Sequence, residues 1–341
     1  MRKSPKDKNK IQLGHGGGGR LTGQLIREAI LPRLDRGHLA TLPDSAILDN
    51  LNGKLAFTTD SFVVSPIFFS GGDIGALAVH GTCNDLACGG AKPEFLSLGL
   101  ILEEGLAMDE LQKILESIAK ASDEAGVEVV TGDTKVVPKG SADKIFINTS
   151  GIGRVKADPV PSMERIKEGD LILLSGSIGN HGLAVMLSRA EFPFNFKLKS
   201  DSASIWPMVE RLLELGPALK FLRDPTRGGL AATLNEMAAA TGLGIYIEEV
   251  SIPMDDTVVS AANILGIDPL QVANEGKLVA VVDGRKASQA HKLLLECELG
   301  KKASIIGDFS SRRPGVVAMY TKVGGCRIIR EPSGELLPRI C

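Results

Sequence analysis

Apolar residues recur at every third or fourth position in several stretches of this chain, which is the spacing of an amphipathic helix. The clearest stretch is 108–125, which Gly126 ends as a C-terminal cap. A second helix is expected over 20–31. A third is expected from Asp73, an N-cap after two glycines, to about Cys88.

Short apolar or alternating runs predict strands between these helices. In the first half of the chain the expected strands are 45–48, 55–59, 95–102, 127–131 and 144–155. In the second half they are 170–174, 244–248, 278–282, 304–306 and 316–320. Further helices are expected over 182–190, 204–215, 229–240, 257–265 and 286–297. Mixed elements in both halves predict an α+β or α/β fold for each.

A proline-rich joint at 158–161 predicts a domain boundary. We expect a flexible basic and glycine-rich N-terminus over 1–19 and an N-terminal domain over 20–157. A C-terminal domain should follow over 162–331, and a mobile tail over 332–341. The total of 341 residues is enough for two domains with separate cores.

Composition excludes several classes of protein. A net charge of −2 argues against a broad nucleic-acid surface, and no run approaches the ~18 apolar residues of a membrane helix. The basic start, 2–10, has no apolar stretch behind it, so it does not read as a secretion signal. Five scattered cysteines without paired spacing predict neither a disulfide framework nor a zinc site. We therefore expect a cytoplasmic protein.

Several aspartates stand beside Gly, Ser or Thr at the expected strand ends and helix starts, where small neighbours let a ligand approach the backbone. They are Asp44, Asp60, Asp85, Asp133 and Asp224. Converging carboxylates without His or Cys favour Mg²⁺, which keeps phosphate and water as its other ligands. Any one of them alone is more often a turn or helix cap, but five together favour a metal–nucleotide site.

The glycine run 14–19 cannot hold regular structure and does not complete a phosphate-binding P-loop, because the Lys and the Ser/Thr are missing. A flap that closes over phosphates and a disordered linker are equal alternatives. Thr134 and Lys135 follow Asp133, and Lys135 and Arg227 are the cations best placed to meet phosphate oxygens.

Three further polar residues are candidates. His80 and Asn84 fall one helical turn apart and can face one site, although a lone His on an apolar helix is usually structural. Glu275, before a glycine in a turn, is a candidate general base, although a turn acid commonly has no such role.

The chain ends in Cys341. A thiol at the tip of a tail can be loaded at one place and carried to another. The ten residues from Pro332 reach roughly 33 Å when extended. An ordinary chain end is the alternative.

Four motifs together carry a resemblance to a known family: FFSGGDIG at 68–75, TGDTKVV at 131–137, NEGKL at 274–278 and the terminal PRIC at 338–341. From His15 to Cys341 the chain resembles the aminoimidazole-ribonucleotide-synthetase (PurM-like) superfamily. Within it, the chain is similar to the HypE family of hydrogenase maturation factors, the carbamoyl dehydratases. The terminal motif separates this family from its relatives.

The resemblance implies a two-domain PurM-like fold and a homodimer in which the N-terminal sheets pair near bound ATP. It implies that the carbamoyltransferase HypF loads a carbamoyl group on Cys341. ATP then drives loss of water from this thiocarbamate, and the resulting thiocyanate supplies cyanide to [NiFe]-hydrogenase iron through a HypC–HypD scaffold.

Site residues also follow from the resemblance. Metal ligation carries over to Asp44, Asp60, Asp85 and Asp224, with Asp133 as a further candidate. Lys135 and Glu275 match residues that handle the substrate group and its proton. Many superfamily members have two consecutive acids where this chain has Asp44-Ser45, so one potential ligand is missing.

Two other functions remain open at this stage. A selenide dikinase or a purine-pathway synthetase would use the same nucleotide motifs but would not need the terminal cysteine. A non-catalytic thiol carrier or scaffold would use the cysteine without hydrolysing ATP.

Overall fold

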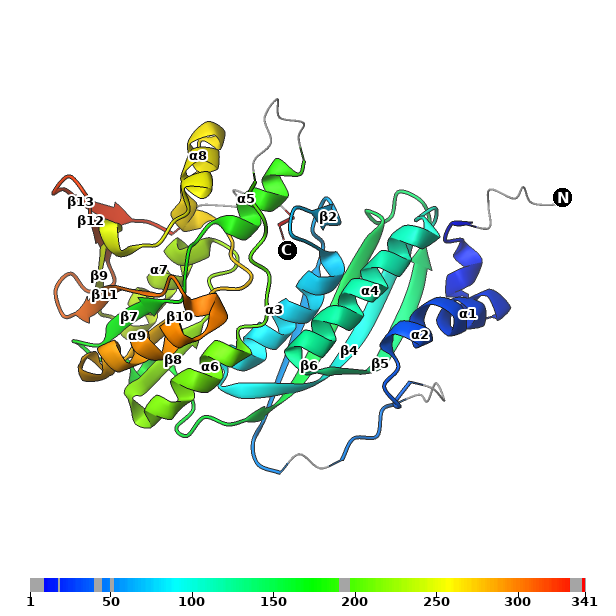
Figure 1. Cartoon of the computed structure of the whole chain (residues 1–341), viewed down its shortest axis with the longest axis horizontal. Helices are drawn as coiled ribbons and strands as arrows, with labels where there is room; N and C mark the ends of the chain where they lie inside the picture. Colours follow the sequence, from blue (N-terminus) through cyan, green and yellow to red (C-terminus); the bar gives the residue numbers. More distant parts are fainter. Residues whose placement is uncertain are drawn as a thin grey trace.

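The computed structural model describes residues 9–17, 19–39, 45–49, 52–189, 197–331 and 339–340. Asp44 and Cys341, two of the predicted site residues, lie outside these ranges. Two α/β domains lie side by side, and residues 339–340 return to the region between them, near α5 and β2 (Figure 1). The predicted fold class is therefore confirmed.

In the described part of the N-terminal domain, the main sheet has the order β1-β6-β4-β5. Its strands are β1 (Leu55–Phe62), β4 (Ala91–Glu103), β5 (Glu128–Val137) and β6 (Ile145–Val155). All neighbours are antiparallel except β4 and β5, which run parallel because α4 (Met108–Ala125) crosses between them. The short pair β2 (Phe68–Phe69) and β3 (Gly72–Asp73) leads into α3 (Ile74–Cys88).

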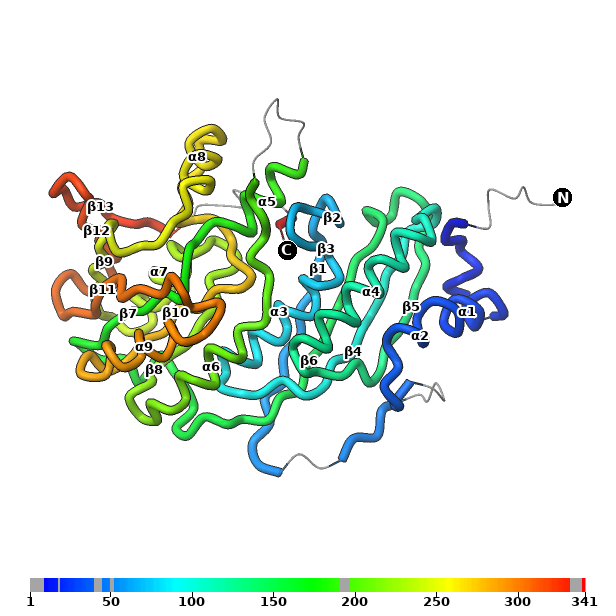
Figure 2. The backbone as a smooth tube through the Cα atoms, in the orientation of Figure 1, coloured from blue at the N-terminus to red at the C-terminus, as the bar shows by residue number. Residues whose placement is uncertain are grey.

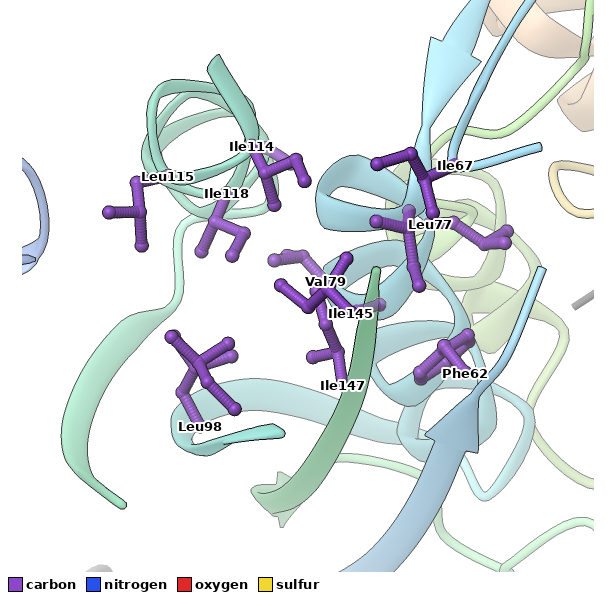
Figure 3. Close-up of a cluster of buried hydrophobic side chains, with 14 of the residues drawn as sticks. Phe62, Ile67, Leu77, Val79, Leu98, Ile114, Leu115, Ile118, Ile145 and Ile147 are labelled. Atoms are coloured by element: carbon purple, nitrogen blue, oxygen red, sulfur yellow. The ribbon is translucent and has the colours of Figure 1, made fainter. Parts of the chain in front are cut away.

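Helices α3 and α4 cover one face of this sheet (Figure 1). Alternate strand residues such as Leu98 and Ile147 meet Leu77 and Ile118 in the core (Figure 3). As predicted, the Asp73 carboxylate caps α3 by accepting from the N–H groups of Gly75 and Ala76, at 2.7 and 3.1 Å. Helix α3 is buried almost all round, because the sheet lies on one side and the C-terminal domain on the other.

The N-terminal segment packs against the edge strand β5. Helical turns run without a break through α1 (Arg20–Leu25), a π-helical stretch (Ile26–Ile30) and α2 (Leu31–Leu34). The expectation that the glycine run 14–19 lacks regular structure is wrong for Gly14–Gly16, which belong to a 3₁₀ turn over Leu13–Gly16. A Cβ on Gly16 would lie 2.5 Å from the Val136 nitrogen, so glycine here permits close packing of the turn on β5.

The C-terminal sheet, as far as the structure describes it, has the order β13-β12-β9-β11-β7-β10-β8. Its strands are β7 (Leu171–Leu174), β8 (Leu219–Arg223), β9 (Gly244–Glu248), β10 (Val279–Val282), β11 (Ser304–Ser310), β12 (Val317–Tyr320) and β13 (Cys326–Ile329). Its helices are α5 (Asn180–Leu187), α6 (Trp206–Leu212), α7 (Gly229–Thr241), α8 (Asp256–Leu265) and α9 (Ala287–Glu296).

Successive residues of the central strands point to opposite faces of this sheet. Ile172 and Leu174 pack in a cluster with Leu230 and Leu234 of α7. Leu173, between them, packs in another cluster with residues of α6 and α9. The tube view shows the resulting layers and the position of α3 beside α6 (Figure 2). These strands are apolar throughout because helices cover both of their faces.

Three expectations about strands are wrong. Residues 45–49 are not a strand. β5 does not end at Thr131 but continues to Val137, so the TGDTKVV motif lies within a strand. β8 and β13 were not expected, since β8 is only five residues long without a regular alternation of apolar and polar residues, and β13 is an exposed edge strand. None of the helices in the described ranges combines the length and the apolar character that a membrane crossing needs.

Candidate functional site

Four of the predicted acids come together where the two domains meet. Asp60 comes from β1, Asp85 from α3, Asp224 from the loop after β8, and Glu275 from the turn before β10. The charge of Asp60 contributes to the raised pKa of Asp85, Asp224 and Glu275, and the charge of Asp85 contributes to that of Asp224 and Glu275. The sequence placed these residues on separate elements, and the fold joins them into one acidic site.

Burial is the main influence on the pKa of each of these acids. It raises the pKa of Asp224 to about 7, and the charges of Asp85 and Asp60 add to the effect. Burial, followed by the charge of Asp224, raises the pKa of Glu275 well above its ordinary value. The pKa values of Asp60 and Asp85 are also raised, again mainly by burial. The cluster therefore favours a bound cation or retained protons.

Arginines stand at the edge of this acidic site. Arg227 Nη2 lies 3.8 Å from Asp60 Oδ1, and the Arg227 side chain is largely exposed. Arg223 opposes the rise in the pKa of Asp85 and Asp224. The exposed guanidinium of Arg227 is available to solvent-borne anions as well as to Asp60.

The turn that carries Glu275 is held by its neighbours. Asn274, fully buried, accepts from Gly179 N at 2.7 Å and donates to Pro225 O at 3.0 Å. Gly276 has to be glycine, because a Cβ there would overlap the Asp201 carbonyl oxygen. Glu275 itself is 2% exposed, and its Oε1 has no hydrogen-bond partner among the described residues. A buried carboxyl oxygen without a partner is expected where a ligand supplies the missing contact.

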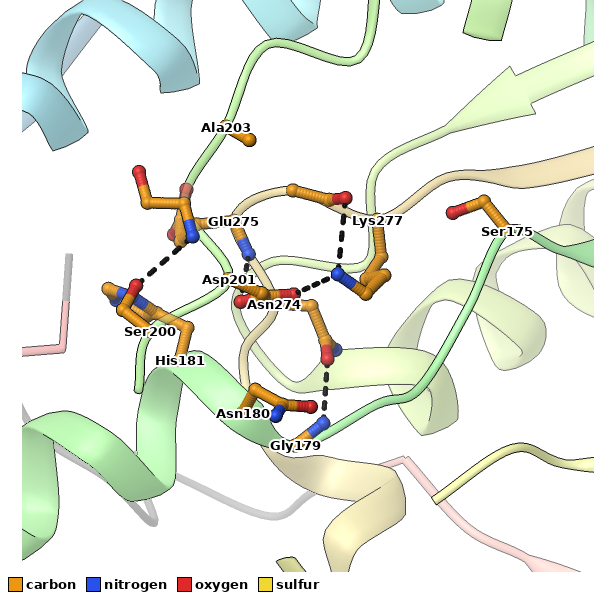
Figure 4. Close-up of polar contacts among 12 residues, drawn as sticks. Ser175, Gly179, Asn180, His181, Ser200, Asp201, Ala203, Asn274, Glu275 and Lys277 are labelled. Atoms are coloured by element: carbon orange, nitrogen blue, oxygen red, sulfur yellow. Dashed lines mark hydrogen bonds and ion pairs between the residues drawn. The ribbon is translucent and has the colours of Figure 1, made fainter. Parts of the chain in front are cut away.

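Asp201 fixes this turn from the opposite side (Figure 4). Its Oδ1 accepts from Glu275 N at 3.3 Å, and its Oδ2 lies 3.0 Å from Lys277 Nζ. The ion pair between Asp201 and Lys277 is almost wholly buried. Sequence reasoning missed Asp201, although an acid between two serines, Ser200 and Ser202, is a pattern that could have been noticed.

His80 and Asn84 face this region from α3 and already have protein partners. His80 Nδ1 lies 2.9 Å from Ser202 Oγ, and burial lowers the pKa of His80 to about 4, so its ring is neutral at pH 7. Asn84 donates to Ala203 O and Glu275 O, and it accepts from Ile205 N. Asn84 thus ties α3 to the C-terminal domain, and its cofactor-binding role stays a prediction.

The other predicted residues are not brought to this acidic site within one chain. Asp133, Thr134 and Lys135 lie on β5, at the opposite edge of the sheet from Asp60 on β1. Three strand spacings separate the two edges, which is about 14 Å. Asp133 and Lys135 are both exposed and pair with each other at 3.1 Å.

Residues 339–340, near the end of the chain, pack against both domains. Ile340 is 4% exposed and belongs to the apolar cluster of the N-terminal domain. Its carbonyl oxygen lies 3.0 Å from Nε2 of His181, a fully buried residue that sequence reasoning did not select. A histidine after Gly179-Asn180 at a helix start was its only sequence signal.

The donor set fits a hard cation. All of the acids that converge here offer oxygen, and Mg²⁺ usually takes one or two carboxylates together with water and phosphate. Across the described residues, no group of three or more His, Cys, Asp or Glu side chains is gathered tightly enough to hold a metal ion. The residues therefore suit Mg²⁺ that arrives with a phosphate ligand rather than a closed protein cage.

Comparison with known proteins agrees with this fold. Residues 43–155 match the family described as AIR synthase related protein, N-terminal domain, and residues 167–319 match AIR synthase related protein, C-terminal domain. The chain is 45% identical over 333 residues to carbamoyl dehydratase HypE of Cupriavidus necator, covering 97% of this chain and 95% of that protein. It is 42% identical over 338 residues to HypE of Escherichia coli, covering 98% and 100%.

Solved structures of related proteins show the same fold. A crystal structure of hydrogenase maturation protein HypE in complex with ATP superposes with a TM-score of 0.93 at 48% identity, covering 97% of this chain and 100% of that one. A structure of a HypE–HypF complex gives 0.79 at 46% identity, covering 90% and 99%. The resemblance read from the four sequence motifs is confirmed, and the chain belongs to the HypE family within the AIR synthase related proteins.

Proposed function

We propose that this protein uses ATP to dehydrate a carbamoyl group carried on the thiol of Cys341, which gives a protein-bound thiocyanate. The thiocyanate is the source of the cyanide ligands of [NiFe]-hydrogenase iron. The observation that carries the proposal is the burial of Ile340, next to last in the chain, which contacts His181 and is linked through His181 and residues 200–201 to the turn of Glu275. An ordinary chain end would lie in solvent, whereas residues 339–340 are held by contacts with both domains.

The chemistry requires activation of the carbamoyl oxygen. Hydroxide is a poor leaving group, since water has a pKa of about 15.7. In our scheme the carbamoyl oxygen attacks the γ-phosphorus of ATP and releases ADP. The C–O bond then breaks, phosphate departs, and the nitrogen loses its protons as the C≡N bond forms. The net change is loss of one water from the thiocarbamate, and that water is accounted for by hydrolysis of ATP to ADP and phosphate.

Glu275 is our candidate for the group that takes a nitrogen proton. Its Oε1 is buried and has no hydrogen-bond partner among the described residues. Its pKa is raised well above the ordinary value by burial and nearby acids, which makes its carboxylate a strong base once it is ionised. Neutral His80, held by Ser202, lies on the same side of α3 as Asn84 and lines this region.

Asp60, Asp85 and Asp224 would hold Mg²⁺, with Asp44 as a further candidate. When bound, Mg²⁺ neutralises phosphate charge and orients the phosphoryl group. Arg227 would contact phosphate oxygens, because its guanidinium is exposed at the edge of the acidic site.

We propose that a second copy of this chain supplies Asp133, Thr134 and Lys135 to the site. These residues lie on the far edge of the sheet, about 14 Å from Asp60. The outer face of the same sheet exposes Leu55 and Phe57, of which Phe57 is 71% exposed. A hollow of about 420 Å³ on this face is lined by Phe57, Phe95 and Ile152. Pairing of two such faces in a homodimer would cover these apolar side chains.

The relatives also suggest partners for this chain. Since a HypE–HypF complex matches it over 90% of its length, we propose HypF as the carbamoyl donor. A HypC–HypD iron scaffold is our proposed acceptor of the cyano group. The described cysteines Cys83, Cys88, Cys297 and Cys326 are free thiols, which fits our placement of the reaction in the reducing cytoplasm.

Mass spectrometry of the C-terminal peptide tests the proposed function. The protein is loaded with its carbamoyl donor system, incubated with Mg-ATP and cleaved after Glu335, which releases residues 336–341. We expect a carbamoyl adduct on Cys341 that loses the mass of one water only when ATP is hydrolysed. Consumption of ATP with an unchanged adduct would contradict the proposal. Cys341→Ala should take up no carbamoyl group, which separates this function from relatives that do not need the thiol.

A further inference from the structure

Residues Arg339 and Ile340 are held by both domains at once. From the N-terminal domain, Arg339 Nη1 meets Asp143 Oδ2 at 2.8 Å, and Arg339 Nε donates to Val63 O at 2.9 Å. From the C-terminal domain, Arg189 Nη2 donates to Arg339 O at 2.7 Å. The full set of contacts to Arg339 therefore forms only when the two domains lie against each other.

His181 supplies the one polar contact to Ile340 that the described residues make. Its Nε2 lies 3.0 Å from the Ile340 carbonyl oxygen, and its Nδ1 lies 2.8 Å from Ser200 Oγ. A carbonyl oxygen can only accept, so Nε2 carries the hydrogen. In a neutral ring Nδ1 then accepts from the Ser200 hydroxyl, whose oxygen accepts in turn from Ser202 N at 3.1 Å. Each donor in this series of hydrogen bonds therefore meets an acceptor, and each hydrogen can be assigned to one atom.

The ring of His181 has little freedom to serve any other acceptor. It is fully buried, and Phe69 packs edge-on against it with the ring centroids 5.4 Å apart. If Ile340 left, the Nε2 hydrogen would lose its partner inside the protein, which is a costly state for a buried donor. The orientation of His181 is thus adapted to a carbonyl that the chain end provides.

The same short segment reaches the acidic site. Between Ser200 and Ser202, Asp201 accepts from Glu275 N (Figure 4). Ser202 Oγ contacts His80 Nδ1. A continuous path of contacts therefore runs from Ile340 through His181 and residues 200–202 to the turn of Glu275. Gly71 lets the N-terminal domain approach this segment, since a Cβ there would lie 2.7 Å from Ser200 N.

We propose that His181, oriented by Ser200, is a positioning residue that holds the chain end through the Ile340 carbonyl and sets its place relative to Glu275. This inference rests on the proposed function, because it concerns delivery of the residue that follows Ile340, Cys341. His181 does not take part in the chemistry. By holding Ile340, His181 determines which part of the site Cys341 can reach.

The test uses the full-length protein and a matched set of variants. His181→Leu removes the donor at similar volume, and His181→Gln keeps an N–H donor. Ser200→Ala keeps His181 and removes the hydroxyl that orients its ring and accepts from Ser202 N. The control is His291→Leu, because His291 Nε2 also contacts a backbone carbonyl, that of Ala303 at 2.8 Å, away from the chain end. Circular dichroism checks that each variant is folded. If His181→Leu does not fold, Ser200→Ala still tests the proposal.

The first measurement is the rate at which iodoacetamide alkylates Cys341 in the unloaded protein, followed on the peptide 336–341. Loss of one hydrogen bond that holds the docked end should raise this rate about fivefold in His181→Leu. Ser200→Ala should give a smaller increase. His181→Gln and His291→Leu should react at the wild-type rate. A wild-type rate in both His181→Leu and Ser200→Ala, or an equal increase in His291→Leu, would overturn the proposal.

The second measurement is the ATP-dependent loss of water from the carbamoylated protein. His181→Leu should slow it by about the same factor, and His181→Gln should recover it, which a purely structural role would not predict. If the wild-type protein loses no water, the proposed function fails while the alkylation rates still decide the role of His181. If the wild type loses water but all variants are alkylated at the wild-type rate, the positioning role of His181 is wrong and the proposed function stands.

Discussion

Replacement of Asp224 by asparagine should stabilise the protein in the absence of metal and nucleotide. Asp224 is 6% exposed, and burial together with Asp85 and Asp60 raises its pKa from 3.8 to about 7. Between these two pH values the folded state keeps a proton that the unfolded state has released. Stability therefore falls as the pH rises from about 4 to about 7.

The size of the effect follows from the same two values. At 1.36 kcal/mol for each factor of ten in proton affinity, ionised Asp224 costs the folded state about 4 kcal/mol above pH 7. Asparagine is neutral at every pH and avoids this cost. A buried carboxylate that destabilises the protein fits a role in ligand binding, since active sites commonly lower stability.

Urea unfolding of the wild type and Asp224→Asn, in EDTA at pH 4 and at pH 8, measures this difference. We expect the variant to be more stable by up to about 4 kcal/mol at pH 8 and nearly equal to the wild type at pH 4. Asp133→Asn is the control, because that carboxylate is exposed and its loss should change stability by less than ~0.5 kcal/mol. An Asp224→Asn protein that is less stable at pH 8, or equally shifted at both pH values, would refute the reasoning.

Three other substitutions probe separate parts of the account. Asn84→Ala should lower the free energy of unfolding by about 3 kcal/mol, since the three hydrogen bonds of this buried side chain are lost at about 1 kcal/mol each. Weaker Mg-ATP binding with unchanged urea unfolding would instead mean that Asn84 contacts the ligand. Gly276→Ala should slow dehydration about 100-fold in a folded protein, because its Cβ displaces the turn of Glu275 from Asp201; wild-type turnover would show that the turn tolerates the shift. Phe57→Asp should separate the proposed homodimer and so halve the mass measured by light scattering, and an unchanged mass would contradict pairing through this face.

Much of the fold could be predicted because local patterns match it. The apolar spacing of α4 and its stop at Gly126, whose φ is +66°, gave both ends of that helix. The Asp73 cap gave the start of α3. The edge strand β13 is mostly exposed and has no alternating apolar pattern to detect, so it was missed.

The candidate site could be predicted only in part, because tertiary contacts assemble it. Sequence reasoning selected Asp60, Asp85, Asp224 and Glu275, but no local pattern states that they converge. It also grouped Asp133 with them, whereas the sheet order puts β5 on the far edge from β1. His181 and Asp201 were missed because their partners, Ile340 and Lys277, are distant in the sequence.

In the proposed function, ATP activates the oxygen of the carbamoyl group on Cys341. The fate of that oxygen can be followed by loading the protein with a carbamoyl group labelled with ¹⁸O and then adding Mg-ATP in unlabelled water. If the carbamoyl oxygen is phosphorylated before it leaves, mass spectrometry of the released inorganic phosphate will find the label there. Unlabelled phosphate formed together with thiocyanate would contradict the account.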